Sequence, residues 1–180
     1  MKDRKLQERR TVSFEGFSYT EHWNNLRQIL ADEPCEGEAR MQAFLVAGYM
    51  LMSQLAPAEQ LQALRPGCPD RLAALVRTPF VLGYIFGLAA VAIDRFGVDR
   101  HSTEATSVIV GVHQIVFDGA SFKDCMQLSG EASGDEDFSL GMEAAAYDAD
   151  AFAFAKVPPV RLSKWLDTQL DVVVPPEKTQ

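Results

Sequence analysis

The sequence predicts a mainly α-helical protein, a single-domain multi-helix bundle around a buried central helix at about residues 78–96. Three observations support this fold class. The stretch Thr78–Ile93 contains no charged residue and is apolar on every side when wound as a helix, which is typical of a buried helix. The other apolar clusters mostly recur at helical spacing, and no turn-linked pair of strands is visible. At 180 residues, the chain is long enough for one domain with a sizeable core.

The chain divides into an expected mobile basic arm (residues 1–10), a single helical domain (11–170) and a loose tail (171–180). The arm has five Lys or Arg residues and little apolar content, so we expect no packing of its own. Apolar residues around Gly16 allow either a short strand or an extended segment lying over helices, and the sequence leaves both open.

Capping residues and breakers define the elements before the central helix. Thr20 is a plausible N-cap for a short amphipathic helix, which Pro34 and Gly37 end. A second long helix follows, and Pro57 is expected to begin a separate short helix. The predicted helices in this part of the chain are 20–30, 38–55, 57–64 and 71–76.

The central helix begins with Thr78 as a candidate cap and Pro79 in the first turn, and it ends near Gly97. Small or short side chains lie on one of its faces, at Gly83, Gly87, Ala90 and Asp94. A glycine inside a helix costs about 1 kcal/mol relative to alanine, so two on one face indicate close approach of another backbone. The stretch is too short for a convincing membrane span.

After the central helix, Ser102 or Thr103 is expected to cap a helix that extends to about Phe117. Because this segment is rich in β-branched residues, a strand over 107–117 is the alternative. The sequence then predicts a short helix near 122–128, a polar loop at 130–137, a helix at 137–154 capped by Ser133 or Asp135, and a last amphipathic turn or two at 162–170.

Residues 87–94 (GLAAVAID) and 141–148 (GMEAAAYD) resemble each other, with Gly, two Ala and Asp in common. One interpretation is chance, because Ala and Gly are frequent in packed helices. The other is a pseudo-symmetric pair of helices whose small faces are in contact, with Asp94 and Asp148 at equivalent ends.

The candidate catalytic residues are His113, Asp94 and Asp148. His113 lies among apolar neighbours at helical spacing, so it is expected to be neutral, either as a base or ligand or as a hydrogen-bonded core histidine. Asp94 and Asp148 lie on faces of small residues. Because an unpaired buried carboxylate is costly, each has three alternatives: exposure at the helix end, a pair with Arg71, Arg77 or Arg95, or a role as a ligand. His22 and His101 have polar neighbours and are expected at the surface.

No motif in the sequence specifies a reaction, a metal or a cofactor. Walker loops, dinucleotide fingerprints, nucleophile elbows and the helical metal-ligand spacings are missing from the sequence. A net charge of −8 argues against nucleic acid, and three scattered cysteines fit a reducing compartment. The polar first ten residues predict no signal peptide, so we expect a cytoplasmic location.

Residues 124–155 contain eight acids and no Lys or Arg, which indicates either a solvated face or a surface for a basic protein partner. The favoured hypothesis is a protein–protein interaction or regulatory module that acts as a homodimer. One alternative is a helical bundle with a small-molecule or metal site near His113 and Asp94 or Asp148, and this alternative leaves an enzyme open. The other is peripheral membrane association through Pro79–Ile93 or the Trp165 segment.

Overall fold

A computed structural model describes residues 18–32, 38–64, 71–117 and 122–171, and in these ranges the chain forms helices and no strand. The prediction of a mainly α multi-helix bundle is confirmed. The helices are α2 (Tyr19–Asp32), α3 (Ala39–Ala63), α4 (Arg71–Leu75), α5 (Pro79–Arg95), α6 (Thr103–Val116), α7 (Phe122–Ala132), α8 (Glu136–Ala155) and α9 (Arg161–Asp171).

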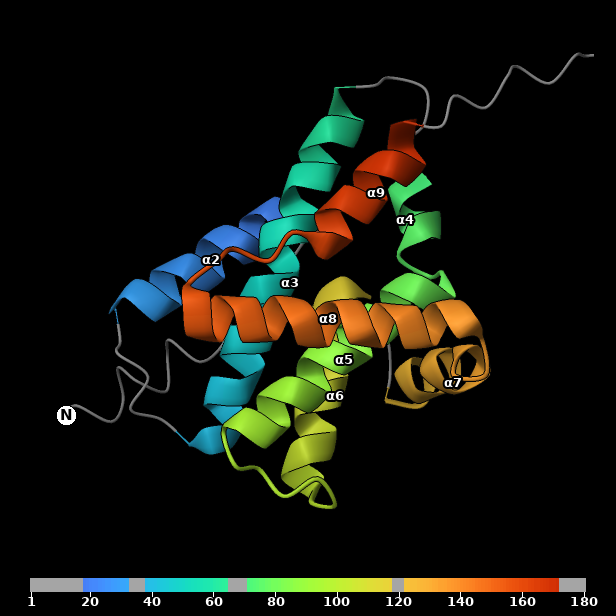
Figure 1. Cartoon of the computed structure of the whole chain (residues 1–180). Helices are drawn as coiled ribbons and strands as arrows, with labels where there is room; N and C mark the ends of the chain where they lie inside the picture. The colour runs from blue at the N-terminus through green and yellow to red at the C-terminus, as the bar shows by residue number, and fades with distance from the viewer. Residues whose placement is uncertain (1–17, 33–37, 65–70, 118–121, 172–180) are drawn as a thin grey trace, which may run out of the picture.

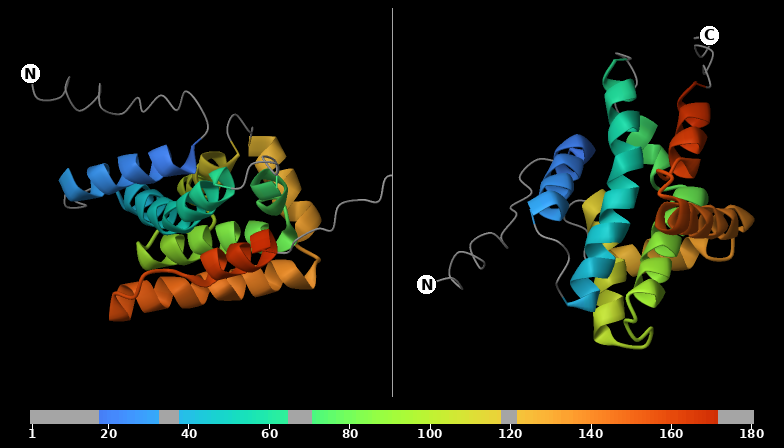
Figure 2. Two further views of the ribbon diagram at one scale, coloured as in Figure 1. Left: turned by 90° about the horizontal axis from the view of Figure 1, so that it is seen from above. Right: turned by 60° about the vertical axis from the view of Figure 1, so that its left-hand side comes forward.

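Helix α5 is the buried centre of the bundle, as the uncharged stretch predicts. Tyr84, Ile85 and Ala89 are fully enclosed, and α5 contacts α3, α6, α7 and α8. Figure 1 shows α8 crossing in front of α3 and α5, and the view from above in Figure 2 places α8 along one outer edge, with α2 on the opposite side. One long face of α8 is therefore available to solvent.

The small faces of α5 and α8 are in contact, as the second interpretation of the sequence similarity proposes. The expected equivalence of Asp94 and Asp148 is wrong, because Asp94 lies at the end of α5 and Asp148 lies inside α8. A Cβ atom added to Gly83 would lie 2.0 Å from the Phe138 carbonyl oxygen, and one added to Gly141 would lie 2.0 Å from the Phe80 carbonyl oxygen. At Gly87, it would lie 2.9 Å from the Ala145 Cβ. Only hydrogen at these positions lets the two backbones approach so closely.

The expected break at Pro57 is wrong, because α3 continues through this residue as one helix. Proline removes one backbone donor and strains the preceding turn, which often ends a helix. Here, Pro57 itself is exposed, while Leu55, Ala56 and Ala58 around it are buried. Core burial of these neighbours outweighs the local penalty.

The segment around 107–117 is helix, and the strand alternative is wrong. Ser102 caps α6 by accepting a hydrogen bond from the Ala105 amide at 3.1 Å, and Asp135 caps α8 by accepting from Asp137 at 2.9 Å. The predicted loop at 130–137 is shorter than expected, because α7 continues to Ala132. Helix α9 is also longer than the predicted turn or two.

Three expectations fall outside the described residues: the basic arm at 1–10, the strand or extended segment around Gly16, and the tail at 172–180.

Candidate functional site

His113 is a buried core residue with both ring nitrogens hydrogen-bonded. Its Nδ1 lies 2.8 Å from the Ile109 carbonyl oxygen, and its Nε2 lies 2.8 Å from the Ser129 hydroxyl on α7. A carbonyl only accepts, so Nδ1 carries the proton and Nε2 accepts from Ser129. Burial lowers the pKa of His113 below its usual 6.5. His113 is 1% exposed, so a substrate cannot reach its ring. Its hydrogen bond to Ser129 connects α6 to α7.

Asp94 is exposed near the end of α5 and pairs with Arg100, whose Nε and Nη2 donate to its two carboxylate oxygens. The candidate partners Arg71 and Arg95 lie elsewhere. Arg71 donates to the Leu170 carbonyl oxygen, and Arg95 lies 3.8 Å from Asp150. A bidentate pair in solvent fixes the turn after α5 and contributes little to stability.

Asp148 is the opposite case, since it is 2% exposed and belongs to a buried polar network. Its carboxylate accepts from the Tyr84 hydroxyl at 2.6 Å and from the Arg161 amide at 3.0 Å. Burial and the Asp148 charge raise the pKa of Tyr84 well above its usual value, so the phenol keeps its proton and donates. The carboxylate satisfies an amide at the start of α9 that has no partner within the helix.

Gln54 of α3 completes this network. Its side-chain nitrogen donates to the Tyr84 hydroxyl at 2.6 Å, and its oxygen accepts from the amides of Leu162 and Ser163 at 2.9 and 3.1 Å. Three successive amides at the start of α9 are thereby satisfied by side chains of α3 and α8. The amides that would bind an anion at this helix start are already used.

Glu59 does the same for α2. Its carboxylate accepts from the amides of Tyr19 and Thr20 at 3.0 and 2.9 Å and from the Ser18 hydroxyl at 3.1 Å. A negative charge at a helix start is favourable. Helix α3 therefore supplies, five residues apart, the groups that anchor α2 and α9.

The exposed face of α8 carries two parallel rows of side chains with a seven-residue repeat. Leu140, Tyr147 and Phe154 form the first, which we call the α8 ridge, and Phe154 is 82% and Tyr147 60% exposed. The second row is acidic and consists of Glu136, Glu143 and Asp150. Seven residues correspond to about two helical turns, so each row follows the helix axis. The half-exposed Ala144 and Ala151 adjoin the ridge.

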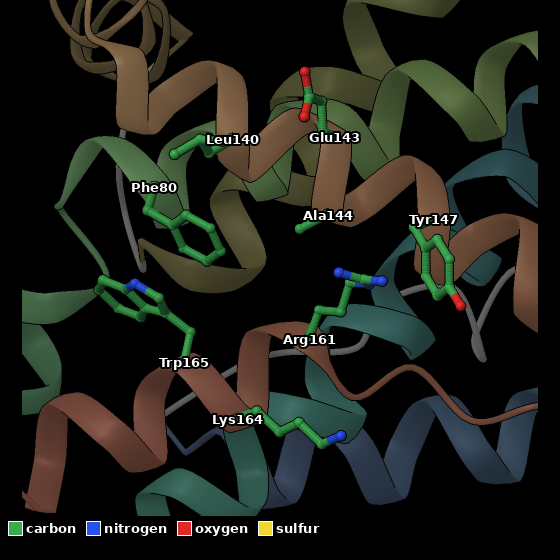
Figure 3. A pocket seen from close by; sticks show the side chains of 8 residues that line it. All are labelled: Phe80, Leu140, Glu143, Ala144, Tyr147, Arg161, Lys164 and Trp165. Carbon is green, nitrogen blue, oxygen red and sulfur yellow. The ribbon is translucent and has the colours of Figure 1, made fainter.

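An open pocket of about 560 Å³ lies between the ridge and α9 (Figure 3). Phe80 and Trp165 stack at one end, with ring centroids 4.8 Å apart. At the other end, the Arg161 guanidinium lies 3.7 Å from the centre of the Tyr147 ring. Figure 3 shows the Glu143 carboxylate pointing away from Arg161 and Lys164. Among the described residues, no ion pair joins these three side chains to another side chain.

The structure separates the three predicted site residues into three environments. His113 contacts α7, Asp94 pairs with a surface arginine, and Asp148 binds Tyr84 and the start of α9. Because Asp148 is buried, it does not contribute to the acidic surface that the sequence of residues 124–155 predicts. His101 is exposed as expected, whereas His22 is buried at 5% exposure, and that expectation is wrong.

Sequence reasoning missed the α8 ridge, although its spacing at 140, 147 and 154 is visible in the sequence. The helix has apolar or small residues on most of its circumference, so periodicity does not show which of them face the core. Gln54, Glu59 and Tyr84 were missed because their partners lie 30 to 109 residues away.

In the described ranges, no group of His, Cys, Asp and Glu side chains has an arrangement suited to a metal ion. None of the described helices combines the length and apolar character that crossing a membrane requires.

The fold and this face define the class of the protein: an all-helical bundle whose outer helix carries an exposed apolar ridge beside an acidic row. No protein-family model, curated protein or solved structure matches the chain.

Proposed function

We propose that the chain is a protein–protein interaction module that acts as a homodimer, with the α8 ridge at the centre of its interface. The observation that supports this proposal is the alignment of three large exposed apolar side chains on one helix face. Single exposed apolar residues are common on protein surfaces, but aligned ones mark contact sites.

The surroundings of the ridge also favour association. Val157 and Val160, in the segment that joins α8 to α9, are exposed apolar residues as well. Aromatic and arginine side chains, which dominate the energetics of interfaces, gather at the pocket beside the ridge. Acidic and basic groups lie on the same face, so one copy offers a second copy both signs of charge.

The test is the molar mass of the purified protein, measured by light scattering or native mass spectrometry over a range of concentrations. We expect a dimer for the unchanged chain and a monomer for the double variant Tyr147→Ser/Phe154→Ser. Leu64→Ser is the matched control, because Leu64 is 80% exposed at the end of α3 and lies off this face. A monomer at all concentrations, or a dimer that survives the double substitution, contradicts the proposal.

A basic protein partner is the alternative occupant of this face, through the acidic row. In that case, the purified chain is monomeric, and Glu143→Lys weakens binding of the partner more than Phe154→Ser does.

The pocket beside the ridge supports a second candidate function, the binding of a small molecule. Its volume lies within the range of about 300–1,000 Å³ that is usual for ligand sites. Aromatic walls and the cations Arg161 and Lys164 suit an apolar ligand with a carboxylate or phosphate group. A mass adduct on the purified protein that Trp165→Ala removes would support this function, and an adduct unaffected by Trp165→Ala would exclude the pocket.

A further inference from the structure

We infer that the two-fold axis of the dimer runs along α8, so that the two copies of α8 lie parallel and Glu143 of each copy faces Arg161 and Lys164 of the other. This inference rests on the proposed function and adds the geometry of the interface.

The argument begins with the order of groups around α8. On one side lies α9, whose Arg161 amide donates to Asp148 and whose Arg161 guanidinium covers Tyr147. Next comes the α8 ridge, which faces solvent. The acidic row follows on the side away from α9, where Asp150 lies 3.8 Å from Arg95 of α5. Beside the pocket, at Tyr147, the order across the face is therefore cations, apolar ridge, acids. At Phe154, the Arg95 guanidinium also lies on the acidic side, 5.2 Å from the centre of the ring.

Two identical helices that meet along this ridge have two symmetric arrangements. If the two-fold axis is perpendicular to α8, the helices are antiparallel and the two acidic rows come to lie on the same side of the interface. If the axis is parallel to α8, left and right are exchanged, and the acidic row of each copy lies on the α9 side of the other. Only the second arrangement brings opposite charges together, and like charges placed opposite each other oppose association.

The charged groups needed for this contact are available. Glu143 points away from the cations of its own chain, and Lys164 is exposed beside the pocket (Figure 3). In the parallel arrangement, Leu140, Tyr147 and Phe154 each meet the same residue of the other copy. The other copy then covers the pocket and removes Phe80 and Trp165 from solvent.

The first test exchanges charges. We expect Glu143→Lys and Lys164→Glu each to raise the dimer dissociation constant at least tenfold, because each places like charges opposite each other. An equimolar mixture of the two variants should form a heterodimer with near-original affinity, since both of its contacts are again complementary. Lys123→Glu, on the exposed side of α7, is the control and should leave the constant within twofold. A Glu143→Lys variant that dimerises more tightly would overturn the inference, because it would show that the acidic rows face each other.

The second test uses cysteine cross-linking in a Cys35→Ser/Cys68→Ser background, in which the buried Cys125 remains. We expect Tyr147→Cys and Phe154→Cys each to form an intermolecular disulfide, at concentrations above the dissociation constant of each variant. Disulfides need Cα atoms within about 7 Å. An antiparallel pair brings at most one of these positions near its own copy and separates the other pair by about 20 Å.

The two proposals fail in different ways. With a dimer present, a disulfide at only one position or at neither overturns the parallel arrangement, because an antiparallel pair centred between residues 147 and 154 leaves both pairs about 10 Å apart. A dimer that survives Tyr147→Ser/Phe154→Ser, or no dimer at all, rejects the α8 ridge as the interface.

Discussion

Tyr84 connects two buried polar side chains, because its hydroxyl accepts a hydrogen bond from the Gln54 amide and donates one to the Asp148 carboxylate. Tyr84→Phe preserves the ring and removes both hydrogen bonds, which leaves a buried carboxylate and a buried amide with one partner fewer. We expect the free energy of unfolding to fall by about 1–3 kcal/mol, the usual cost of an unmade buried hydrogen bond. Denaturant unfolding measures this loss. Tyr49→Phe, on a half-buried ring beside Phe152, should change stability by no more than about 0.5 kcal/mol.

His113 predicts a loss of stability in mild acid. Its pKa in the folded protein is lowered by burial, whereas the unfolded chain takes up a proton at about pH 6.5. Below pH 6.5, the unfolded state therefore binds more protons, and stability falls as pH decreases towards the folded-state pKa. One proton gives a slope of at most about 1.4 kcal/mol per pH unit.

The measurement is the unfolding free energy between pH 5 and 8. The exposed His101 is the control, so His101→Gln should keep the slope and His113→Gln should reduce it. An unchanged slope in His113→Gln would contradict the neutral, buried assignment.

The contact between α5 and α8 depends on glycine. A Cβ atom at position 141 would meet backbone atoms, the Phe80 carbonyl oxygen at 2.0 Å and the Tyr84 nitrogen at 2.8 Å, so the helices would have to separate. We expect Gly141→Ala to lower the unfolding free energy by about 3 kcal/mol or more, at the upper end of the cost of overpacking.

Gly130→Ala is the matched control for this prediction. Position 130 also lies in a helix, α7, but a Cβ atom there meets nothing within 4 Å. The substitution should therefore stabilise the protein by up to about 1 kcal/mol through helix propensity. Thermal unfolding tests whether the two substitutions change the melting temperature in opposite directions. Equal effects of both substitutions would show that Gly141 does not limit how closely α5 and α8 approach.

The elements were predictable from the sequence where a local signal defines them. Ser102, Asp135 and the uncharged stretch 78–93 mark helices α6, α8 and α5 because capping and burial act over a few residues. Pro57 misled because the packing of distant helices on α3 decides whether the helix continues. The same holds for Asp148, whose burial depends on the position of α9.

Association of the whole molecule should make its thermal stability depend on concentration. Only folded chains dimerise, so the stabilisation that dimerisation gives to the folded state grows with protein concentration. We expect the melting temperature of the unchanged chain to rise by several degrees over a hundredfold increase in concentration. The Tyr147→Ser/Phe154→Ser variant should melt at one temperature throughout, and Leu64→Ser should follow the unchanged chain. A concentration-independent melting temperature in the unchanged chain would argue for a monomer.

The interaction surface was only partly accessible to sequence reasoning. The acidic run suggested a partner surface at 124–155 but did not show which side chains of this segment face solvent. The α8 ridge becomes visible only when the rest of the bundle shows which face of α8 is left uncovered.

The hydrogen bonds of Gln54 also bear on folding during synthesis. The side-chain oxygen of Gln54 accepts from the amide of Leu162, which is synthesised 108 residues later. At a synthesis rate of about 5–20 residues per second, this partner follows about 5–20 s later. During that interval, Gln54 and Tyr84 belong to a nascent chain whose central polar network is incomplete. The bundle therefore acquires its native core only after α9 has been synthesised, and a substitution in α9 affects the maturation of helices that left the ribosome much earlier.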